Sequence, residues 1–431
     1  MLERLTKKAA QAEVFEIESE ATKIGFEANK LKSFEVEETR GIAVRVVVDG
    51  RLGFAVSSDL SAADKLIANA LESARHGDAL PAFRFPPPHP GPEVQVYDPK
   101  LAALPTERLI DMGREMIAIL LEADAESRIN IELERRVRRT RVHNSAGVEV
   151  TVQKAPLSIV TMVERVRGDD VALLFRYFGT TVWNEEYRAF ARGIADKLRL
   201  AQQAATLSSR RMPVLFSPNG AAALAIPLMQ GLDGKNVYRA ISPMAGQVGE
   251  RLFEEKLTVV DDPTLDGRPG SSSHDDEGVP RRRRPLVERG VLRGFLYDLK
   301  TAAQAGTEPT GSAARKLFSP PSPAFSNLVV EAGETPVTEI IAGIEEGLLV
   351  EDPLGLGQGN VISGAFSNNL SLAFKIESGE IVGRVKDVSI AGNIYQDLRR
   401  VEAVSRESEW VYGGASLPYI LLPELNVVTK G

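Results

Sequence analysis

The stretch IAVRVVVDGRLGFAV, residues 42–56, indicates the architecture of this chain. Two apolar runs rich in β-type residues flank the dipeptide Asp49-Gly50. Asp-Gly favours a type I′ turn, which joins two antiparallel strands because both of its central residues have positive φ. An earlier run, VFEIE at residues 14–18, alternates with the period of a half-buried strand. We therefore expect the N-terminal part to be built around antiparallel hairpins.

Helical spacing of apolar residues interrupts these strands. It occurs in residues 61–77, 106–122 and 183–207. Residues 220–230, GAAALAIPLMQ, are apolar nearly all round, which predicts a buried helix. The last third of the chain is mostly strand-like runs and Gly-rich turns. The pattern predicts an α+β fold, with an α/β-type N-terminal region that contains antiparallel hairpins and a C-terminal region rich in long antiparallel strands.

A proline-rich segment divides the chain. The sequence PAFRFPPPHPGP, residues 81–92, cannot form a helix or a central strand. At about 150 residues per domain, a chain of 431 residues is expected to hold two or three domains. We expect an N-terminal α+β domain at residues 1–84, a Pro-rich linker at 85–105, a middle α+β segment at 106–210 that packs with the N-terminal domain, and a C-terminal β-rich domain at 211–431.

Composition argues against several classes of function. The 52 Lys and Arg residues are outnumbered by 59 Asp and Glu, and a net charge of −7 is unfavourable for binding nucleic acid or a membrane surface. No stretch approaches the roughly 18 apolar residues that span a bilayer, and the first residues carry no apolar run typical of a signal peptide. We therefore expect a cytoplasmic protein with no nucleic-acid or membrane partner.

The residues needed for common active sites are scarce. Cysteine is absent, which excludes disulfides, cysteine nucleophiles and thiolate zinc sites. The four histidines, His76, His89, His143 and His274, are far apart in sequence, so no HExxH or HExxxH spacing is possible. No G-x-S-x-G motif is present either. The sequence thus contains no standard zinc-protease or serine-hydrolase motif.

A glycine-rich run, GLGQGN at residues 355–360, superficially matches a dinucleotide-binding loop. That motif requires a strand, the spacing G-x-G-x-x-G, and a helix whose N-terminus meets the phosphates. Here the spacing is G-x-G-x-G and β-type residues follow. A flexible turn is therefore favoured over a nucleotide site.

An acidic segment precedes four consecutive arginines. Its carboxylates belong to Asp261, Asp262, Asp266, Asp275, Asp276 and Glu277, and the arginines are residues 281–284. Clustered carboxylates can hold Ca²⁺ or Mg²⁺, but the EF-hand spacing is absent. The favoured interpretation is a solvated acidic loop that faces the arginines. The sequence does not assign a role to the arginine run.

An ordered set of segments, roughly from residue 14 to residue 427, resembles the TldD/PmbA family. The segments are GIAVRVVVDGRLGFAVSSDLSAADKLIANALESAR (41–75), NSAGVEV (144–150), SPMAGQVGERLF (242–253), residues 259–306, which begin VVDDPTLDGRPGSSSHDDEGVP, PTGSAAR (309–315), and residues 362–395, which begin ISGAFSNNLSLAFKIESGE. The sequence GSAAR at 311–315 replaces the family's more usual GNA-type sequence, and the arginine run is not expected of the family.

The resemblance implies a partnership. The family has two branches, TldD and TldE (also called PmbA), and it also carries the older label of modulator of DNA gyrase. TldD-type and TldE-type chains are expected to pair into a zinc metalloprotease that acts on unfolded peptides. In the TldD branch, an HExxxH helix and a C-terminal cysteine supply the zinc ligands and the base.

The helix that matches this motif lies at residues 222–234, AALAIPLMQGLDG. Ala225 and Ile226 fall where the first histidine and the glutamate would be, and Gln230 falls where the second histidine would be. Neither Ala225 nor Ile226 can bind zinc or transfer a proton. We therefore assign no catalytic residue and no metal ligand to this chain, and expect zinc only in a partner subunit.

The leading hypothesis is a TldE/PmbA-like, non-catalytic subunit of a TldD/TldE-type peptidase complex. Its partners would be a TldD-like zinc-bearing subunit and an unfolded peptide, held by strand addition to an exposed edge. Homo- and heterodimers both remain open. His274, Asp275, Asp276, Glu277 and Gly278 are candidate contacts to the peptide or the partner.

Two alternatives remain at the level of sequence. One is an active peptidase or hydrolase with a non-standard metal site in residues 271–278. The other is a homodimeric binding protein without a peptidase partner. The sequence does not identify the peptide.

Overall fold

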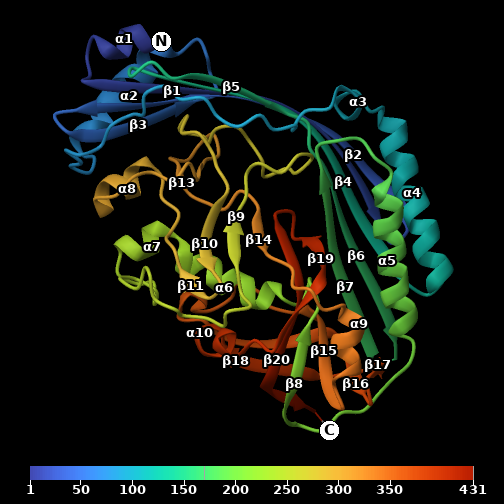
Figure 1. Ribbon diagram of the computed structural model, residues 1–431. Coiled ribbons are helices and arrows are strands. Elements are labelled where there is room, and N and C mark those ends of the chain that lie inside the picture. Colours follow the sequence, from blue (N-terminus) through green and yellow to red (C-terminus); the bar gives the residue numbers. More distant parts are fainter. Residues whose placement is uncertain (169, 431) are drawn as a thin grey trace.

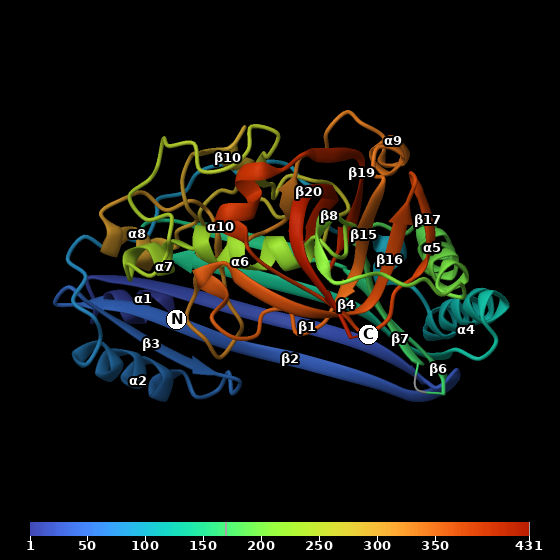
Figure 2. The same ribbon diagram turned by 90° about the horizontal axis from the view of Figure 1, so that it is seen from below.

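Two large β-sheets form the protein (Figures 1 and 2). The computed structural model describes residues 1–168 and 170–430. One sheet has seven strands and the other has eleven, and helices pack against both. The predicted α+β class is confirmed. No helix in the described residues is long and apolar enough to cross a bilayer.

The first sheet is antiparallel throughout, in the order β3-β2-β1-β4-β6-β7, and β5 pairs with β4. Its strands are β1 (Gln11–Glu27), β2 (Lys30–Val48), β3 (Arg51–Ser57), β4 (Arg128–Asn144), β5 (Glu149–Lys154), β6 (Leu157–Arg167) and β7 (Asp170–Thr180).

The predicted hairpin joins β2 to β3. β2 ends at Val48 and β3 begins at Arg51, so Asp49-Gly50 is the whole connection. Asp49 has φ of 49° and Gly50 has φ of 73°, which is the positive pair that a type I′ turn needs. The hairpin prediction is confirmed.

Five helices accompany the first half of the chain. They are α1 (Leu2–Thr6), α2 (Ala63–Arg75), α3 (Pro99–Ala102), α4 (Thr106–Ala123) and α5 (Glu186–Leu200). The helix expected over residues 183–207 is shorter at both ends. The chain leaves helical geometry after Leu200 because the next segment joins the second sheet: the amide of Ala205 donates to the carbonyl of Arg384 at 2.8 Å.

The second sheet follows the order β11-β10-β9-β14-β20-β18-β16-β15-β8, with β17 beside β16 and β19 beside β20. Its strands are β8 (Arg210–Phe216), β9 (Val259–Asp261), β10 (Arg284–Glu288), β11 (Val291–Leu292), β14 (Leu328–Val330), β15 (Glu346–Pro353), β16 (Ala365–Glu377), β17 (Glu380–Arg384), β18 (Val388–Asn393), β19 (Ala403–Val411) and β20 (Ala415–Thr429). A small separate sheet pairs β12 (Ala313–Ala314) with β13 (Ser322–Pro323). Most pairings are antiparallel, but β15 pairs with β8 and β14 pairs with β20 in parallel.

Short helices connect these strands. They are α6 (Ala222–Leu232), α7 (Gly234–Tyr238), α8 (Leu299–Ala305), α9 (Val337–Ala342), α10 (Ile394–Asp397) and the 3₁₀ turns η1 (Val361–Ser363) and η2 (Leu398–Arg400). α6 packs in the main core of the second sheet.

The first sheet curves around the part of the chain that carries the second (Figure 1). At one end a single apolar cluster unites α4 and α5 with both sheets; Leu133 of β4, Tyr187 of α5 and Phe374 of β16 belong to it and are essentially inaccessible to solvent. Because so many buried apolar side chains are shared, burial itself holds the two sheets together. At the other main core, the outer face of α6 lies beside the start of β16, and both line one cavity.

Candidate functional site

Helix α6 carries the three residues that the family resemblance aligns with a zinc motif. Ala225 points into the core and is 6% exposed. Ile226 is half-buried and Gln230 is exposed, and both line a groove on the surface. The prediction of a buried helix is therefore right for the inner face of α6 and wrong for these two positions.

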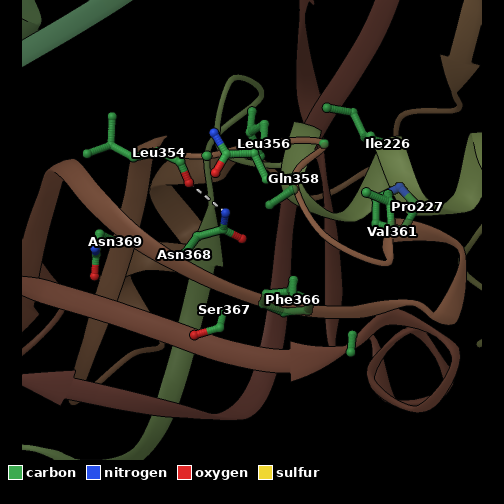
Figure 3. A pocket seen from close by; sticks show the side chains of 14 residues that line it. Ile226, Pro227, Leu354, Leu356, Gln358, Val361, Phe366, Ser367, Asn368 and Asn369 are labelled. Carbon is green, nitrogen blue, oxygen red and sulfur yellow. Dashed lines mark hydrogen bonds between the residues drawn. The ribbon is translucent and has the colours of Figure 1, made fainter.

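The groove consists of two adjoining cavities of about 360 and 420 Å³, which share Ile226, Gly357 and Val361. Figure 3 shows the first cavity, with Ile226, Pro227 and Val361 on one side and Leu354 and Asn369 on the other. Its remaining lining residues are Ala223, residues 355–358 and residues 365–368. The second cavity adds Gln230, Asn236, Ile241, Gly359, Asn360 and Ile362.

The glycine-rich run forms one wall of this groove. Gly355, Gly357 and Gly359 all have φ between 71° and 76°, a left-handed conformation that glycine adopts without steric cost. The run is followed by the three-residue turn η1 and then by β16. A phosphate-binding helix N-terminus does not follow, which favours the interpretation as a turn over a nucleotide site.

The start of β16 offers an open strand edge to the groove. Over residues 365–369, β16 pairs with β18 on one side, and β15 pairs with it only from Leu370 onward. The amide of Leu354 donates to the carbonyl of Asn369 at 2.7 Å, so the hydrogen-bonding groups of Asn369 face the groove side. Because these groups alternate along a strand, those of Ser367 and Ala365 face the same way and have no strand partner among the described residues.

The chemistry of the groove is uniformly neutral. Its described lining residues are glycines, apolar side chains, amides such as Asn368 and Gln358, and the hydroxyl of Ser367. The side-chain amide of Asn368 donates to the carbonyl of Leu354 at 2.7 Å (Figure 3). Zinc in proteins is bound by imidazole nitrogens, thiolates or carboxylates, none of which is among the described lining residues. The groove is suited to hydrogen bonding and apolar contact, not to metal binding or proton transfer.

The predicted contact segment, residues 271–278, lies in the long connection between β9 and β10 and is largely internal. Asp275 accepts the amides of Glu277 and Val279, each at 2.9 Å, and that of Ala313 at 3.0 Å. Glu277 accepts the amide of Leu299 at 2.7 Å and is ion-paired with Arg45. Burial raises the pKa of both carboxyl groups.

The prediction of a solvated acidic loop is therefore wrong for four of its six carboxylates, although Asp266 is exposed and Asp276 is half-buried. Asp261, Asp262, Asp275 and Glu277 are all buried, as is Arg281 of the arginine run. Burial of these carboxylates is possible because backbone amides and arginine side chains supply their hydrogen bonds. Some of these partners are local, such as the amides of Glu277 and Val279, and others, such as the amide of Ala313, are brought close only by the fold.

His274, Asp276 and Gly278 complete the predicted segment. His274 is half-buried; its Nε2 lies 3.0 Å from the carbonyl of His89 and its Nδ1 lies 3.1 Å from Ser273 Oγ. Asp276 accepts the amide of Arg315 at 2.8 Å, and Gly278 is buried with φ of 77°. Among the described residues no three His, Asp or Glu side chains are grouped so as to hold a metal ion. A role of this segment in partner or peptide contact stays a prediction.

A buried ion network, not foreseen from the sequence, links the N-terminal hairpin to this segment. Arg45 Nε donates to Glu13 at 2.9 Å, Arg315 donates to the same carboxylate at 2.8 Å, and Arg45 also pairs with Glu277. The rings of Phe83 and Phe85 lie 5.9 and 5.2 Å from the Arg45 guanidinium. The only sequence signal is that Glu13 and Arg45 occupy strands otherwise rich in apolar residues.

Comparison with known proteins identifies the family. Residues 209–429 match the family described as PmbA/TldA metallopeptidase C-terminal domain, and residues 12–74 match PmbA/TldA metallopeptidase domain 1. An uncharacterized protein of Methanocaldococcus jannaschii is 27% identical over 395 residues, which is 90% of each chain. A protein of Haemophilus influenzae named metalloprotease TldD homolog is 32% identical over 180 residues, covering 42% of this chain and 37% of its own length.

Solved structures agree over the whole chain. The crystal structure of TldE from Thermococcus kodakarensis superposes with a TM-score of 0.90 at 25% identity, over 99% of this chain and 98% of that one. A protein from Thermotoga maritima named as a modulator of a DNA gyrase has the same fold, with a TM-score of 0.87 at 23% identity and 99% coverage of both chains. From the matched domains, which cover β1 to β3 of the first sheet and all strands of the second, we conclude that this chain belongs to the PmbA/TldD metallopeptidase family.

Proposed function

We propose that this chain is a TldE/PmbA-type, non-catalytic subunit of a TldD/TldE-type zinc metallopeptidase complex that acts on unfolded peptides. The observation that carries the proposal is the neutral groove on α6. Ile226 and Gln230 line it at positions where the TldD branch is expected to have ligands and a base, and no ionisable side chain is among its described lining residues. The likeness to TldE along the whole chain supports the same branch.

In this proposal, the groove holds a peptide in an extended conformation. The backbone groups of Ser367 and the carbonyl of Ala365 would pair with the peptide backbone, as in strand addition; the N–H of Ala365 donates to Ser363 Oγ at 3.4 Å. Such pairing is insensitive to most side chains, which suits an unfolded substrate of varied sequence. Ile226 and Leu356 supply apolar contact beside this edge.

The partner subunit would supply zinc and the attacking water. This chain would contribute by fixing a flexible peptide, since holding two reacting groups in the right geometry can itself contribute several kcal/mol to the rate. In this proposal α6 needs no metal to stay folded, because Leu224, Ala225 and Leu228 pack in the apolar core.

The test measures cleavage of an unstructured peptide by this chain, by a TldD-like chain from the same organism, and by the mixture. We expect no cleavage by this chain alone, less than 0.1 equivalents of bound zinc in it by elemental analysis, and cleavage restored or raised in the mixture. Cleavage by this chain alone that persists in chelator, or one tightly held zinc per chain, would contradict the proposal.

A pair of variants tests the open edge of β16. Ser367→Pro removes one backbone N–H from the free edge, whereas Ser367→Ala keeps that N–H and removes only the hydroxyl. We expect the mixture with Ser367→Pro to cleave the peptide several-fold more slowly, while the mixture with Ser367→Ala cleaves at the wild-type rate. Thermal melts of both variants control for folding. Equal loss of activity in both would refute strand addition at this edge.

A further inference from the structure

A cavity of about 270 Å³ lies between β4, β5 and the segment that precedes the arginine run. Four basic side chains line it: Arg136, Arg138, Lys154 and Arg281. It shares no lining residue with the α6 groove. Its volume is near the lower end of the range for small-molecule sites, so it suits a ligand of about one amino-acid residue rather than a nucleotide.

Arg281 is the central observation. Its side chain is buried, and only Nη2 has a partner, the carbonyl of Ala313 at 3.3 Å. Its Nε and Nη1 are shielded from solvent and have no hydrogen-bond partner among the described residues. A buried guanidinium with unmade hydrogen bonds is costly, so the site requires an acceptor that the chain does not supply.

Of the other three basic side chains, Arg136 is ion-paired with Glu134 at 2.7 Å, whereas the remaining two have no carboxylate in direct contact among the described residues. Within the described part of the chain, Arg138 and Lys154, like Arg281, form no ion pair. Lys154 donates to the carbonyl of Pro269 at 3.3 Å, and the Nε of Arg138 is buried without a partner. Burial, together with the nearby charges of Arg281 and Arg138, lowers the pKa of the Lys154 ammonium to about 7.

The acidic residues on the wall restrict the charge of the ligand. Asp275 is satisfied by three backbone amides and Asp276 by the amide of Arg315, so neither makes a direct ion pair with Arg281. Their charges still repel an anion, and more strongly a dianion such as phosphate than a carboxylate. The remaining wall is partly apolar, through Val142, Val152 and Phe325.

We propose that this cavity binds a carboxylate carried on an apolar body, with Arg281 as its fork-like hydrogen-bond donor and Lys154 and Arg138 as supporting cations. A guanidinium can bind both oxygens of a carboxylate, which would supply the partners that Nε and Nη1 lack. Two sources have this chemistry: the C-terminal residue of a peptide and a free small carboxylic acid. The peptide source rests on the proposed function, whereas carboxylate binding itself does not.

Isothermal titration calorimetry of the full chain, in a buffer without carboxylate or phosphate, tests the chemistry. N-acetyl-leucine should bind saturably, and N-acetyl-leucinamide, which lacks the carboxylate, should bind at least tenfold more weakly. Equal affinity for the acid and the amide, or tighter binding of inorganic phosphate than of the acid, would overturn the proposal.

Two variants and one control locate the binding. Arg281→Gln and Arg138→Gln should each weaken binding of N-acetyl-leucine, by at least tenfold for Arg281→Gln, whereas Arg282→Gln, which changes the exposed neighbouring arginine, should not. The Arg138 variant keeps the test open if Arg281→Gln unfolds in a thermal melt. Wild-type affinity in a folded Arg281→Gln, or in Arg138→Gln when only that variant is folded, would refute the assignment.

The source of the carboxylate is tested with a leucine-terminated tetrapeptide in its free-acid and amidated forms. Tighter binding of the free-acid tetrapeptide than of N-acetyl-leucine supports a peptide C-terminus; weaker binding overturns that source. All these titrations use this chain without zinc or a partner. Failure of the reconstituted peptidase would therefore leave the carboxylate site standing, and failure of the titrations would leave the groove proposal standing.

Discussion

The buried ammonium of Lys154 lowers the stability of the folded chain, and the same side chain lines the proposed carboxylate site. Its pKa is lowered from 10.5 to about 7 by burial first and by Arg281 and Arg138 next, with Asp276 acting in the opposite direction. Below pH 7 the folded chain holds a buried ammonium, and that cost is fully present. Such a residue is typical of a binding site, because a purely structural position would favour an apolar side chain.

The stability change on replacing Lys154 should depend on pH. Between about pH 7 and 10.5 the folded state binds fewer protons than the unfolded state, so Lys154 makes wild-type stability rise with pH, by at most about 1.4 kcal/mol per pH unit. Lys154→Met lacks this titration. We expect the variant to be more stable than wild type at pH 7 and its advantage to shrink towards pH 10, in urea denaturation at each pH.

Lys65→Met serves as the control, because Lys65 is exposed on α2 and no burial cost is removed with it. A stability difference for Lys154→Met that is constant from pH 7 to pH 10 would contradict the titration assigned to this residue.

At the scale of elements, α6 has two faces of opposite character. Ala222, Ala225 and Leu232 are buried, while Ile226 is half-buried and Gln230 is exposed at the groove. Pro227, inside the helix, has no N–H to donate to the carbonyl of Ala223, and both residues line the groove. The helix thus combines core packing with the floor of a binding surface.

A matched pair of aspartates on α6 separates these faces. Ala225→Asp places an unpaired carboxylate in the apolar core and should reduce the free energy of unfolding by about 3 kcal/mol or more. Gln230→Asp adds the same group to the exposed face and should cost less than about 1 kcal/mol. Chemical denaturation of both variants measures the difference. A melt of Ala225→Asp that matches wild type would show that this position is open to solvent.

The two ends of β16 likewise serve different purposes. From Leu370 to Glu377 it lies between β15 and its other neighbours in the sheet, and residues such as Phe374 are fully buried. From Ala365 to Asn369, β18 is its one strand partner within the described part of the chain. One strand therefore extends from the core to an open edge at the groove.

At the scale of the whole molecule, the network of Glu13, Arg45, Glu277 and Arg315 ties the N-terminal hairpin to the second half of the chain. Although burial raises the pKa of Glu13, the charges of Arg315 and Arg45 outweigh it and hold that pKa below its usual value. The carboxylate of Glu13 is therefore ionised inside the protein, and its charged form depends on both arginines.

Arg45→Met should be strongly destabilising. It removes the shared cation and leaves the carboxylates of Glu13 and Glu277 buried with fewer partners, at a cost of about 3–5 kcal/mol. Arg211→Met breaks an exposed pair with Glu424 and should cost about 1 kcal/mol or less. Urea denaturation compares the two. An equal decrease in the free energy of unfolding for both variants would contradict the stabilising role assigned to the buried network.

The sequence by itself determined those features that depend only on residues close together along the chain. The turn at Asp49-Gly50, the helical stripes and the α+β class follow from local conformational preference and from apolar periodicity. The absence of zinc ligands from α6 follows from residue identity alone, because no fold can give Ala225 or Ile226 a ligating atom.

Only the tertiary structure decided which polar groups meet. Arg45 and Glu277 are separated by 232 positions in the sequence, and the residues near either one do not predict that the two form an ion pair. The burial of Asp275 and the unpartnered donors of Arg281 depend on which backbone groups the fold brings beside them. The open edge of β16 depends on where its pairing with β15 stops. The physical reason is that burial and hydrogen bonding are set by contacts across space, whereas turns and helices are set by residues a few positions apart.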